Sequence, residues 1–301
     1  MRKNDMPCPP FSENEDIFVT RSPLPPLAEY LRCVEDIFAT RRLTNNQTYV
    51  HRLEESLGCF LKLSHVSLSV NGTAALQLAL RLSGLAGKKV LTTPFTYVAT
   101  LSALLWEGCT PVFADINPDT LCLAPEAVEE ALDVHPDVAG LLPVHVYGNA
   151  CDADRLERLC IERGLTCMYD AAHAFGSTLN GHTLLEFGNY AACSFHATKL
   201  FHTVEGGCLV THSIEDQRRV ELLRAFGHIG DEHLTLGINA KMSELHAAMG
   251  LCLLPLLAEN IRLREEICTR YDALLTSTAA RGRLRAPQLL ACSLFLFEII
   301  H

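Results

Sequence analysis

The chain has 301 residues, of which 49% are hydrophobic and 20% charged, and its formal net charge at pH 7 is -10. This length allows one large domain with a smaller one, and the hydrophobic content argues against disorder. An acidic chain without a long Lys/Arg cluster is a poor candidate for binding nucleic acid, and no segment approaches the ~18 apolar residues of a membrane helix.

The first part of the chain is rich in proline. Residues 1–26 include Pro7, Pro9, Pro10, Pro23, Pro25 and Pro26. Proline blocks helix formation, so we expect an extended N-terminal arm. The following residues, 27–42 and 47–63, have helical patterns separated by the breaker Thr44-Asn45-Asn46.

Short apolar segments then alternate with helical ones up to residue 170. The predicted strands cover 66–70, 90–93, 111–114, 141–146 and 165–169, and the predicted helices cover 74–82, 97–106, 125–132 and 154–163. Such alternation predicts an α/β fold, a three-layer sandwich with a mostly parallel central sheet that is covered by helices on both faces.

The pattern changes after Asp170. Short strands are predicted at 177–179, 190–194 and 208–211, with an Asn180-Gly181 turn between the first two, and helices at 214–226, 243–254 and 255–276. The last helix is long and amphipathic and could lead to a second domain. We therefore expect an arm (1–26), a large domain (27–254) and the start of a small C-terminal domain (255–301).

Thirteen cysteines are scattered through the chain, mostly in apolar runs. Cys167, Cys193, Cys208 and Cys252 are expected in the core, as small apolar side chains. The chain has no paired C-x-x-C arrangement of the zinc or redox kind, so no metal site is predicted. A reducing compartment, the cytoplasm, is the natural expectation.

Two residues suggest a specific chemistry. Lys199 lies among aromatic, small and hydroxyl residues and is followed by Gly206-Gly207, and Asp170 ends a predicted parallel strand. Each has an ordinary alternative, since a loop lysine is usually a surface charge and such an aspartate often caps a helix. A desolvated lysine can form a Schiff base with an aldehyde, and a buried aspartate can keep a pyridine nitrogen protonated. Together these roles point to pyridoxal phosphate (PLP).

Other residues fit the same cofactor. Gly72 and Thr73 join a strand to a helix, where free N–H groups favour phosphate, and Ser194 could add a hydroxyl. The ring of Tyr97 could lie on the face of the cofactor, although ordinary core packing is the alternative.

Three further polar residues have more than one interpretation. His173 follows Asp170 by three residues and His196 precedes Lys199 by three, and both could be interior histidines. Asn239 precedes a predicted helix and could serve only in a turn or cap.

At this point the chain resembles the DegT/DnrJ/EryC1/StrS family of sugar aminotransferases, PLP enzymes of fold type I, the aspartate-aminotransferase fold. The segments that carry the resemblance are NGTAAL (71–76), PFTYVAT (94–100), PVFADI (111–116), LPVHVYGNACD (142–152), YDAAHAFGS (169–177), SFHATKLFHTVEGG (194–207) and GINAKMSELHAAMG (237–250). They span about residues 27 to 275.

The resemblance implies a role for each candidate residue. It implies that Lys199 bonds the cofactor aldehyde and moves the proton, that Asp170 pairs with the pyridine nitrogen and that Tyr97 stacks on the ring. Gly72, Thr73 and Ser194 are implied to bind the phosphate. His173 is implied to sit near the ring oxygen, a position often occupied by Gln in relatives. Asn239 is implied to reach the phosphate from the neighbouring subunit of a homodimer.

The residues around Lys199 resemble those of one subfamily. Lysine rather than histidine at 199 favours amino transfer over dehydration, and Ser194-Phe195-His196 with Glu205-Gly206-Gly207 resembles members that act at C4 of the sugar. The resemblance therefore implies transamination of a dTDP- or UDP-linked 4-keto-6-deoxyhexose, with glutamate as the amino donor.

The end of the chain departs from the family. The recognisable pattern stops near residue 285, and the apolar stretch 288–301 does not resemble the family's small domain. We therefore expect the small domain to be incomplete. This leaves two alternatives open: a non-catalytic regulatory or interaction protein with a PLP fold, and a PLP enzyme of the same fold acting on another ketone or amino acid.

Overall fold

The structure is a computed structural model that describes residues 20–279, with side chains up to residue 274. Its centre is a seven-stranded sheet with the strand order β1-β9-β8-β5-β4-β2-β3. The bounds are β1 Val66–Ser69, β2 Lys89–Thr92, β3 Thr110–Phe113, β4 Val138–Leu141, β5 Thr166–Asp170, β8 Tyr190–Ser194 and β9 Gly207–Val210. All pairings are parallel except those of β9, which runs antiparallel to both β1 and β8.

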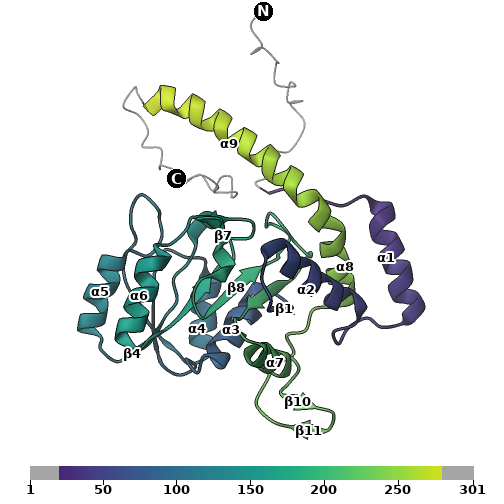
Figure 1. Ribbon diagram of the computed structural model, residues 1–301, viewed down its shortest axis with the longest axis horizontal. Coiled ribbons are helices and arrows are strands. Elements are labelled where there is room, and N and C mark those ends of the chain that lie inside the picture. The colour runs from purple at the N-terminus through teal and green to yellow at the C-terminus, as the bar shows by residue number, and fades with distance from the viewer. Residues whose placement is uncertain (1–19, 280–301) are drawn as a thin grey trace, which may run out of the picture.

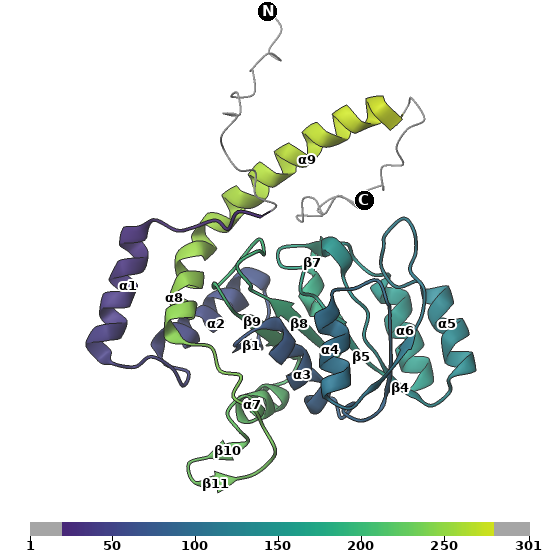
Figure 2. The same ribbon diagram turned by 180° about the vertical axis from the view of Figure 1, so that it is seen from behind.

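Helices cover both faces of this sheet, as the α/β pattern predicts (Figures 1 and 2). The helices are α1 Leu27–Thr40, α2 Thr48–Leu61, α3 Gly72–Leu82, α4 Val98–Trp106, α5 Pro125–Val134, α6 Ala153–Arg163, α7 Ile214–Leu223, α8 Glu244–Leu253 and α9 Leu257–Ala279. Short 3-10 turns lie at Val146–Gly148, Leu184–Glu186 and Leu254–Leu256.

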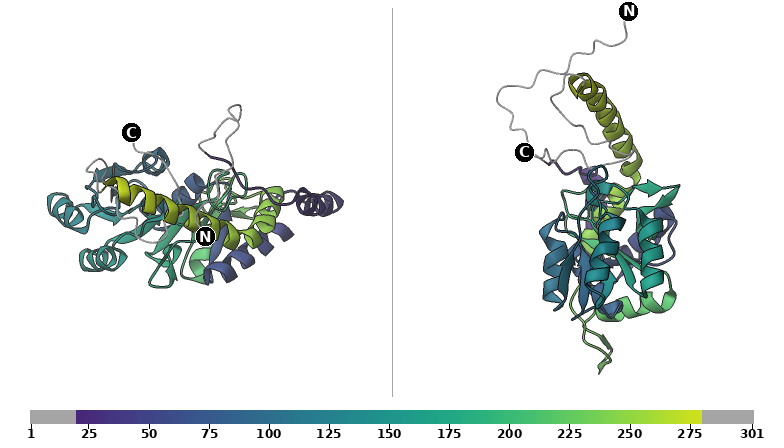
Figure 3. Two further views of the ribbon diagram at one scale, coloured as in Figure 1. Left: turned by 90° about the horizontal axis from the view of Figure 1, so that it is seen from above. Right: turned by 90° about the vertical axis from the view of Figure 1, so that its left-hand side faces the viewer.

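Alternation along the strands builds a separate core on each face. In β5, Tyr169 belongs to the core beneath α2, α5, α6 and α8, whereas its neighbour Met168 belongs to the core beneath α3, α4 and α7. Cys193 and Ala192 divide in the same way in β8. Successive strand residues point to opposite faces, so the chain forms the predicted three-layer sandwich (Figure 3). The expected burial of Cys167, Cys193, Cys208 and Cys252 is confirmed.

Some predicted elements are wrong in their limits. The strand predicted at 141–146 is β4, which ends at Leu141 because Pro143 has no N–H to continue a ladder, and Val146–Gly148 forms a turn instead. The Asn180-Gly181 turn exists, but it joins β6 (Thr178–Leu179) to the unpredicted strand β7 (His182–Thr183). A second unpredicted hairpin joins β10 (His228–Ile229) and β11 (Glu232–His233).

The helix predicted at 214–226 is shorter than expected. It ends at Leu223, because Phe226 and Gly227 have positive φ angles of 62° and 75°, which no helix accommodates.

The two ends of the described chain can be compared with the predicted N-terminal arm and the predicted small C-terminal domain. Residues 20–26 have no regular secondary structure before α1 begins at Leu27, and residues 1–19 lie outside the described residues. Helix α9 extends beyond the sheet (Figure 3). The division into 27–254 and 255–301 stays a prediction, and the apolar stretch 288–301 lies outside the described residues.

None of the helices within residues 20–279 combines the length and the apolar character that crossing a bilayer requires. In the same part of the chain, no three His, Cys, Asp or Glu side chains are grouped so that they could hold a metal ion.

Candidate active site

The predicted site residues gather at the carboxyl ends of the parallel strands. Asp170 is the last residue of β5 and Ser194 is the last of β8, while Gly72 follows β1 and Tyr97 follows β2. Because these strands are parallel, their carboxyl ends share one edge of the sheet, where open α/β folds bind ligands. The fold therefore brings together segments that are more than 100 residues apart.

Asp170 is a buried carboxylate with two hydrogen-bond donors. Its Oδ2 accepts from the Thr100 hydroxyl at 2.6 Å and its Oδ1 accepts from the Ala172 N–H at 3.1 Å. Burial raises the pKa of Asp170, while the two hydrogen bonds and the charge of Lys199 act in the opposite direction. A buried carboxylate held in this way can pair with a cationic partner at the same edge.

The hydrogen bond from Thr100 extends to a second hydroxyl. The Oγ1 atoms of Thr96 and Thr100 are 2.7 Å apart. An ionised carboxylate can only accept, so Thr100 donates to Asp170, and Thr96 must therefore donate to Thr100. The chain Thr96 to Thr100 to Asp170 thus runs in one direction, and each bond strengthens the next.

His173 lies one turn beyond Asp170 and is neutral. Its Nδ1 accepts from the Tyr147 N–H at 3.2 Å, and its ring lies nearly parallel to that of Tyr147, with centroids 6.0 Å apart. Burial, and secondly the charge of Lys199, lower the pKa of His173 to about 3. Because Nδ1 accepts, Nε2 carries the ring proton in the neutral form.

Gly72 and Ser194 form a close cradle. A Cβ atom at Gly72 would lie 2.9 Å from Ser194 Cβ, and one at Gly207 would lie 2.7 Å from the Gly72 nitrogen. Only glycine allows β1, β8 and β9 to approach so closely here. Asn71 caps α3 by accepting from the Ala74 N–H at 2.8 Å, and the N–H groups of Gly72 and Thr73 have no carbonyl one turn earlier in the helix.

Lys199 is half-buried in a turn that follows β8. Its backbone N–H donates to the His196 carbonyl at 2.9 Å. The turn is anchored by Phe195 and Phe201, which are fully buried and pack edge to face with centroids 5.0 Å apart. The charge of Lys199 acts on the pKa values of both Asp170 and His173, as expected if its amine faces the same site.

The other predicted residues are exposed. The Tyr97 side chain is 72% exposed at the start of α4, three residues before Thr100. Asn239 is exposed and accepts from the Lys241 ammonium at 2.7 Å. His196 is exposed beside Thr198, with Nδ1 and Oγ1 2.8 Å apart, so the interior alternative for this histidine is wrong.

Thr96 and Thr100 are the residues that sequence reasoning missed. Both lie inside the segment PFTYVAT, and Thr100 follows Tyr97 by three residues, which places both on one side of the first turn of α4. That spacing was the available signal, although it does not reveal that Asp170 is the partner.

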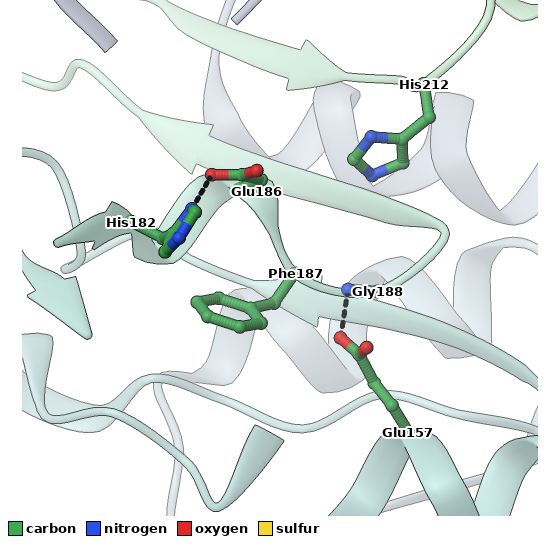
Figure 4. A pocket seen from close by; sticks show the side chains of 6 residues that line it. All are labelled: Glu157, His182, Glu186, Phe187, Gly188 and His212. Atoms are coloured by element: carbon green, nitrogen blue, oxygen red, sulfur yellow. Dashed lines mark hydrogen bonds and ion pairs between the residues drawn. The ribbon is translucent and has the colours of Figure 1, made fainter. Parts of the chain in front are cut away.

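A cavity of about 440 Å³ lies elsewhere, at the edge where β8 begins (Figure 4). It is lined by Glu157, His182, Glu186, Phe187, Gly188 and His212. His182 and Glu186 are paired at 3.0 Å, and Glu157 accepts from the Gly188 N–H at 2.6 Å. No predicted site residue lines this cavity, so it is separate from the candidate active site.

Comparison with known proteins gives a consistent result. The sequence model of the DegT/DnrJ/EryC1/StrS aminotransferase family matches residues 28–300, which reaches beyond position 285, where the motif pattern was expected to stop. A dTDP-4-amino-4,6-dideoxy-D-glucose transaminase of Shigella dysenteriae is 41% identical over 236 residues, covering 78% of this chain and 64% of that protein.

Two solved structures extend the likeness to the fold. DesI, crystallised in the presence of its TDP-sugar product, superposes with a TM-score of 0.76 and 35% identity, covering 83% of this chain and 65% of that one. NtdA of Bacillus subtilis with bound cofactor PMP superposes with a TM-score of 0.82 and 26% identity, covering 93% and 66%. The chain thus spans just under two thirds of the length of these relatives.

Proposed function

The chain belongs to the DegT/DnrJ/EryC1/StrS aminotransferase family, and from this premise we propose that it transfers an amino group to a nucleotide-linked keto-deoxysugar with PLP as cofactor. The proposed acceptor is C4 of a dTDP- or UDP-linked 4-keto-6-deoxyhexose, and the proposed donor is glutamate. The similarity to a dTDP-4-amino-4,6-dideoxy-D-glucose transaminase and to DesI supports the 4-position. The thiols of Cys193 and Cys208 suit a reducing compartment, so the cytoplasm is the proposed location.

The observation that carries the proposal is the presence of a buried carboxylate, Asp170, and a lysine, Lys199, at one edge of the sheet. Asp170 is 5% exposed and accepts two hydrogen bonds. Burial raises its pKa, and the two hydrogen bonds and the charge of Lys199 oppose that rise. A carboxylate in this setting is costly unless a cation completes the site. A protonated pyridine ring is such a cation, so the residues fit PLP.

The cradle supports the same cofactor. The close packing at Gly72 and Gly207 brings the start of α3 against Ser194, where two N–H groups and the Ser194 hydroxyl can face a phosphate. Phosphate binds readily at a helix N-terminus because of the free N–H groups and the helix dipole. Gly72, Thr73 and Ser194 therefore hold the phosphate in the proposal, at the edge that also carries Asp170.

PLP, when bound, supplies an electron-withdrawing ring that stabilises negative charge at the carbon bonded to the amino group. Asp170 keeps the ring nitrogen protonated, with Thr100 and Ala172 holding its oxygens in place. Lys199 would provide the amine that holds the cofactor through its aldehyde, with loss of water, and would afterwards move the proton between the two carbon atoms of each half-reaction, as a general acid and base. Tyr97 would cover the ring face, and His173, held neutral, would donate from Nε2 toward the ring oxygen.

The proposal includes a homodimer in which Asn239 reaches the phosphate of the neighbouring subunit. Its exposure leaves its side chain on the outer surface, and the adjacent Ala240 carbonyl accepts from the Val70 N–H at 2.8 Å, close to the cradle. A side chain at this position could serve a second copy.

Absorbance and mass spectrometry test the proposal. Purified protein with PLP should absorb at about 420 nm, and borohydride should fix the cofactor to Lys199. Lys199→Ala should lose that link, whereas Lys88→Ala, at an exposed lysine, should keep it. Glutamate should release 2-oxoglutarate, and 4-keto sugars should react faster than 3-keto isomers.

Each result has a clear meaning. Absence of the reducible link in the wild-type protein would overturn the cofactor assignment. A link without release of 2-oxoglutarate would favour the non-catalytic alternative. Release of 2-oxoglutarate without amination of any nucleotide-linked keto sugar would favour an enzyme acting on another ketone.

A further inference from the structure

The described chain begins with a segment that returns to the lysine turn. Residues 20–26 precede α1, and Figure 2 shows this stretch running back across the molecule toward the start of α9. Ser22 Oγ donates to the Ala197 carbonyl at 2.5 Å, and His202 Nε2 donates to the Pro23 carbonyl at 2.7 Å. The two contacts join residues 175 and 179 positions apart in the chain.

The two contacts lie on either side of Lys199. Ala197 precedes the lysine by two residues and His202 follows it by three. Between them, the backbone turn is closed by the hydrogen bond from Lys199 N–H to the His196 carbonyl. The N-terminal segment therefore fixes both ends of the short stretch that carries the amine.

The contacts have the burial and geometry of a built interface. The His202 side chain is 1% exposed, and its Nδ1 accepts from the Val204 N–H at 3.2 Å, so its Nε2 must carry the proton that it donates to Pro23. Pro25 is buried and Ser22 and Pro23 are half-buried, whereas Leu24 between them is 71% exposed. Ser22, Pro23 and Pro25 thus face the body of the protein, while Leu24 faces outward.

The prolines make the segment a suitable clamp. Pro23, Pro25 and Pro26 each fix their own φ angle and restrict the residue before them. A chain that is already restricted loses little conformational entropy when it docks, so two hydrogen bonds suffice to hold it.

We propose that residues 22–25 form a clamp that positions the turn bearing Lys199, with Ser22 and His202 as its positioning residues. This inference deepens the proposed function, because it concerns the lysine assigned there. With the clamp in place the amine keeps its direction toward the edge that holds Asp170. Without it, the turn samples other conformations and the amine meets the cofactor aldehyde less often.

The test compares Ser22→Ala and His202→Phe with the wild-type protein. Ser22→Thr retains the hydroxyl and His202→Gln retains a donor near Nε2, so both should rescue. Arg21→Ala, at the exposed neighbouring residue, is the matched control. Loss of one neutral hydrogen bond corresponds to about a two- to tenfold change in an equilibrium.

Two measurements give the readout. Backbone amides of residues 196–204 in the cofactor-free protein should exchange about two- to tenfold faster in Ser22→Ala and His202→Phe, while strands β5 and β8 stay at wild-type rates. The fraction of PLP fixed to Lys199 by borohydride at limiting PLP should fall by a similar factor. In the double variant, the change in exchange rate and in PLP capture should not exceed the product of the changes in the two single variants, because both hydrogen bonds hold the same segment.

Wild-type exchange rates and wild-type PLP capture in both single variants would overturn the clamp. If His202→Phe fails to fold, Ser22→Ala alone tests the clamp. Ser22 is only half-buried, so its replacement by alanine should leave the fold intact. If the wild-type protein captures no PLP, the proposed function fails, and exchange in the cofactor-free protein still decides whether the clamp holds this turn.

Discussion

Replacing Thr100 by Val should show how much the hydrogen bond from Thr100 contributes to the role of Asp170, because the carboxylate itself stays in place. Valine has nearly the shape of threonine but cannot donate to Asp170 Oδ2, which now accepts at 2.6 Å. A hydrogen bond to an ionised group contributes about 1.5–3 kcal/mol. Its loss removes one of the causes that lower the pKa of Asp170, so this pKa, already raised by burial, rises further.

If the pKa of Asp170 rises, the proton shared with the ring nitrogen of a bound cofactor would lie more on the carboxylate, and the ring nitrogen would be less protonated. Since about 1.36 kcal/mol corresponds to a factor of ten in rate, kcat should fall by about one to two orders of magnitude, with the KM for the sugar little changed. The acidic limb of the kcat–pH profile should move to higher pH. The assay is steady-state amination of the keto sugar between about pH 5 and 9.

Two matched variants sharpen this prediction. Thr100→Ser keeps the hydroxyl and should retain most activity, whereas Thr96→Val removes only the donor to Thr100 and should cost less than about fivefold, since cooperativity adds roughly 10–30% per bond. A Thr100→Val enzyme with wild-type kcat and an unmoved acidic limb would show that the bond does not tune Asp170.

Three further predictions concern the rest of the site. Gly72→Ala places a Cβ 2.9 Å from Ser194 Cβ and should weaken PLP binding at least tenfold, measured by absorbance titration; unchanged affinity would refute the phosphate cradle. The pKa of His173 is lowered to about 3, so its contribution to folding is present above the unfolded value of 6.5 and is lost as pH falls toward 3. In His173→Gln, thermal unfolding should therefore depend less on pH in this window, and an identical pH profile would contradict the burial of a neutral ring. Inactive Lys199→Ala and Asn239→Ala chains, once mixed, should form heterodimers with one site that has both residues and regain part of the activity; lack of recovery despite mixed dimers would argue against a shared site.

Much of the fold was predictable because the hydrophobic periods are regular. The strand at 190–194 was predicted with its observed limits, since Tyr190 to Ser194 is a short, mostly apolar run that follows the turn residues Gly188 and Asn189. The direction of β9 was not predictable from residues 207–210, because parallel and antiparallel strands share the same apolar pattern. The hairpin β10–β11 was missed because its strands are only two residues long.

The candidate site was predictable only where a residue type stands out in the sequence. Asp170 and Lys199 follow apolar strands, and the structure places Asp170 at the expected edge. Thr100 and His202 gave no comparable signal, because hydroxyl and imidazole side chains in apolar segments serve many structural roles. Their importance rests on partners 70 and 179 residues away, which only the folded chain identifies.

The reversed direction of β9 limits how the lysine segment can vary. Because β9 runs against β8, the stretch after Ser194 leaves and re-enters the sheet at the same edge, and Gly207 resumes the ladder opposite Ser194. A parallel β9 would have needed a crossover helix before Gly207, with a long connection to carry the amine. With β9 antiparallel, the segment that carries Lys199 is held at both ends by the adjacent strands β8 and β9. Insertions in this segment should therefore be far less tolerated than insertions in the β10–β11 hairpin.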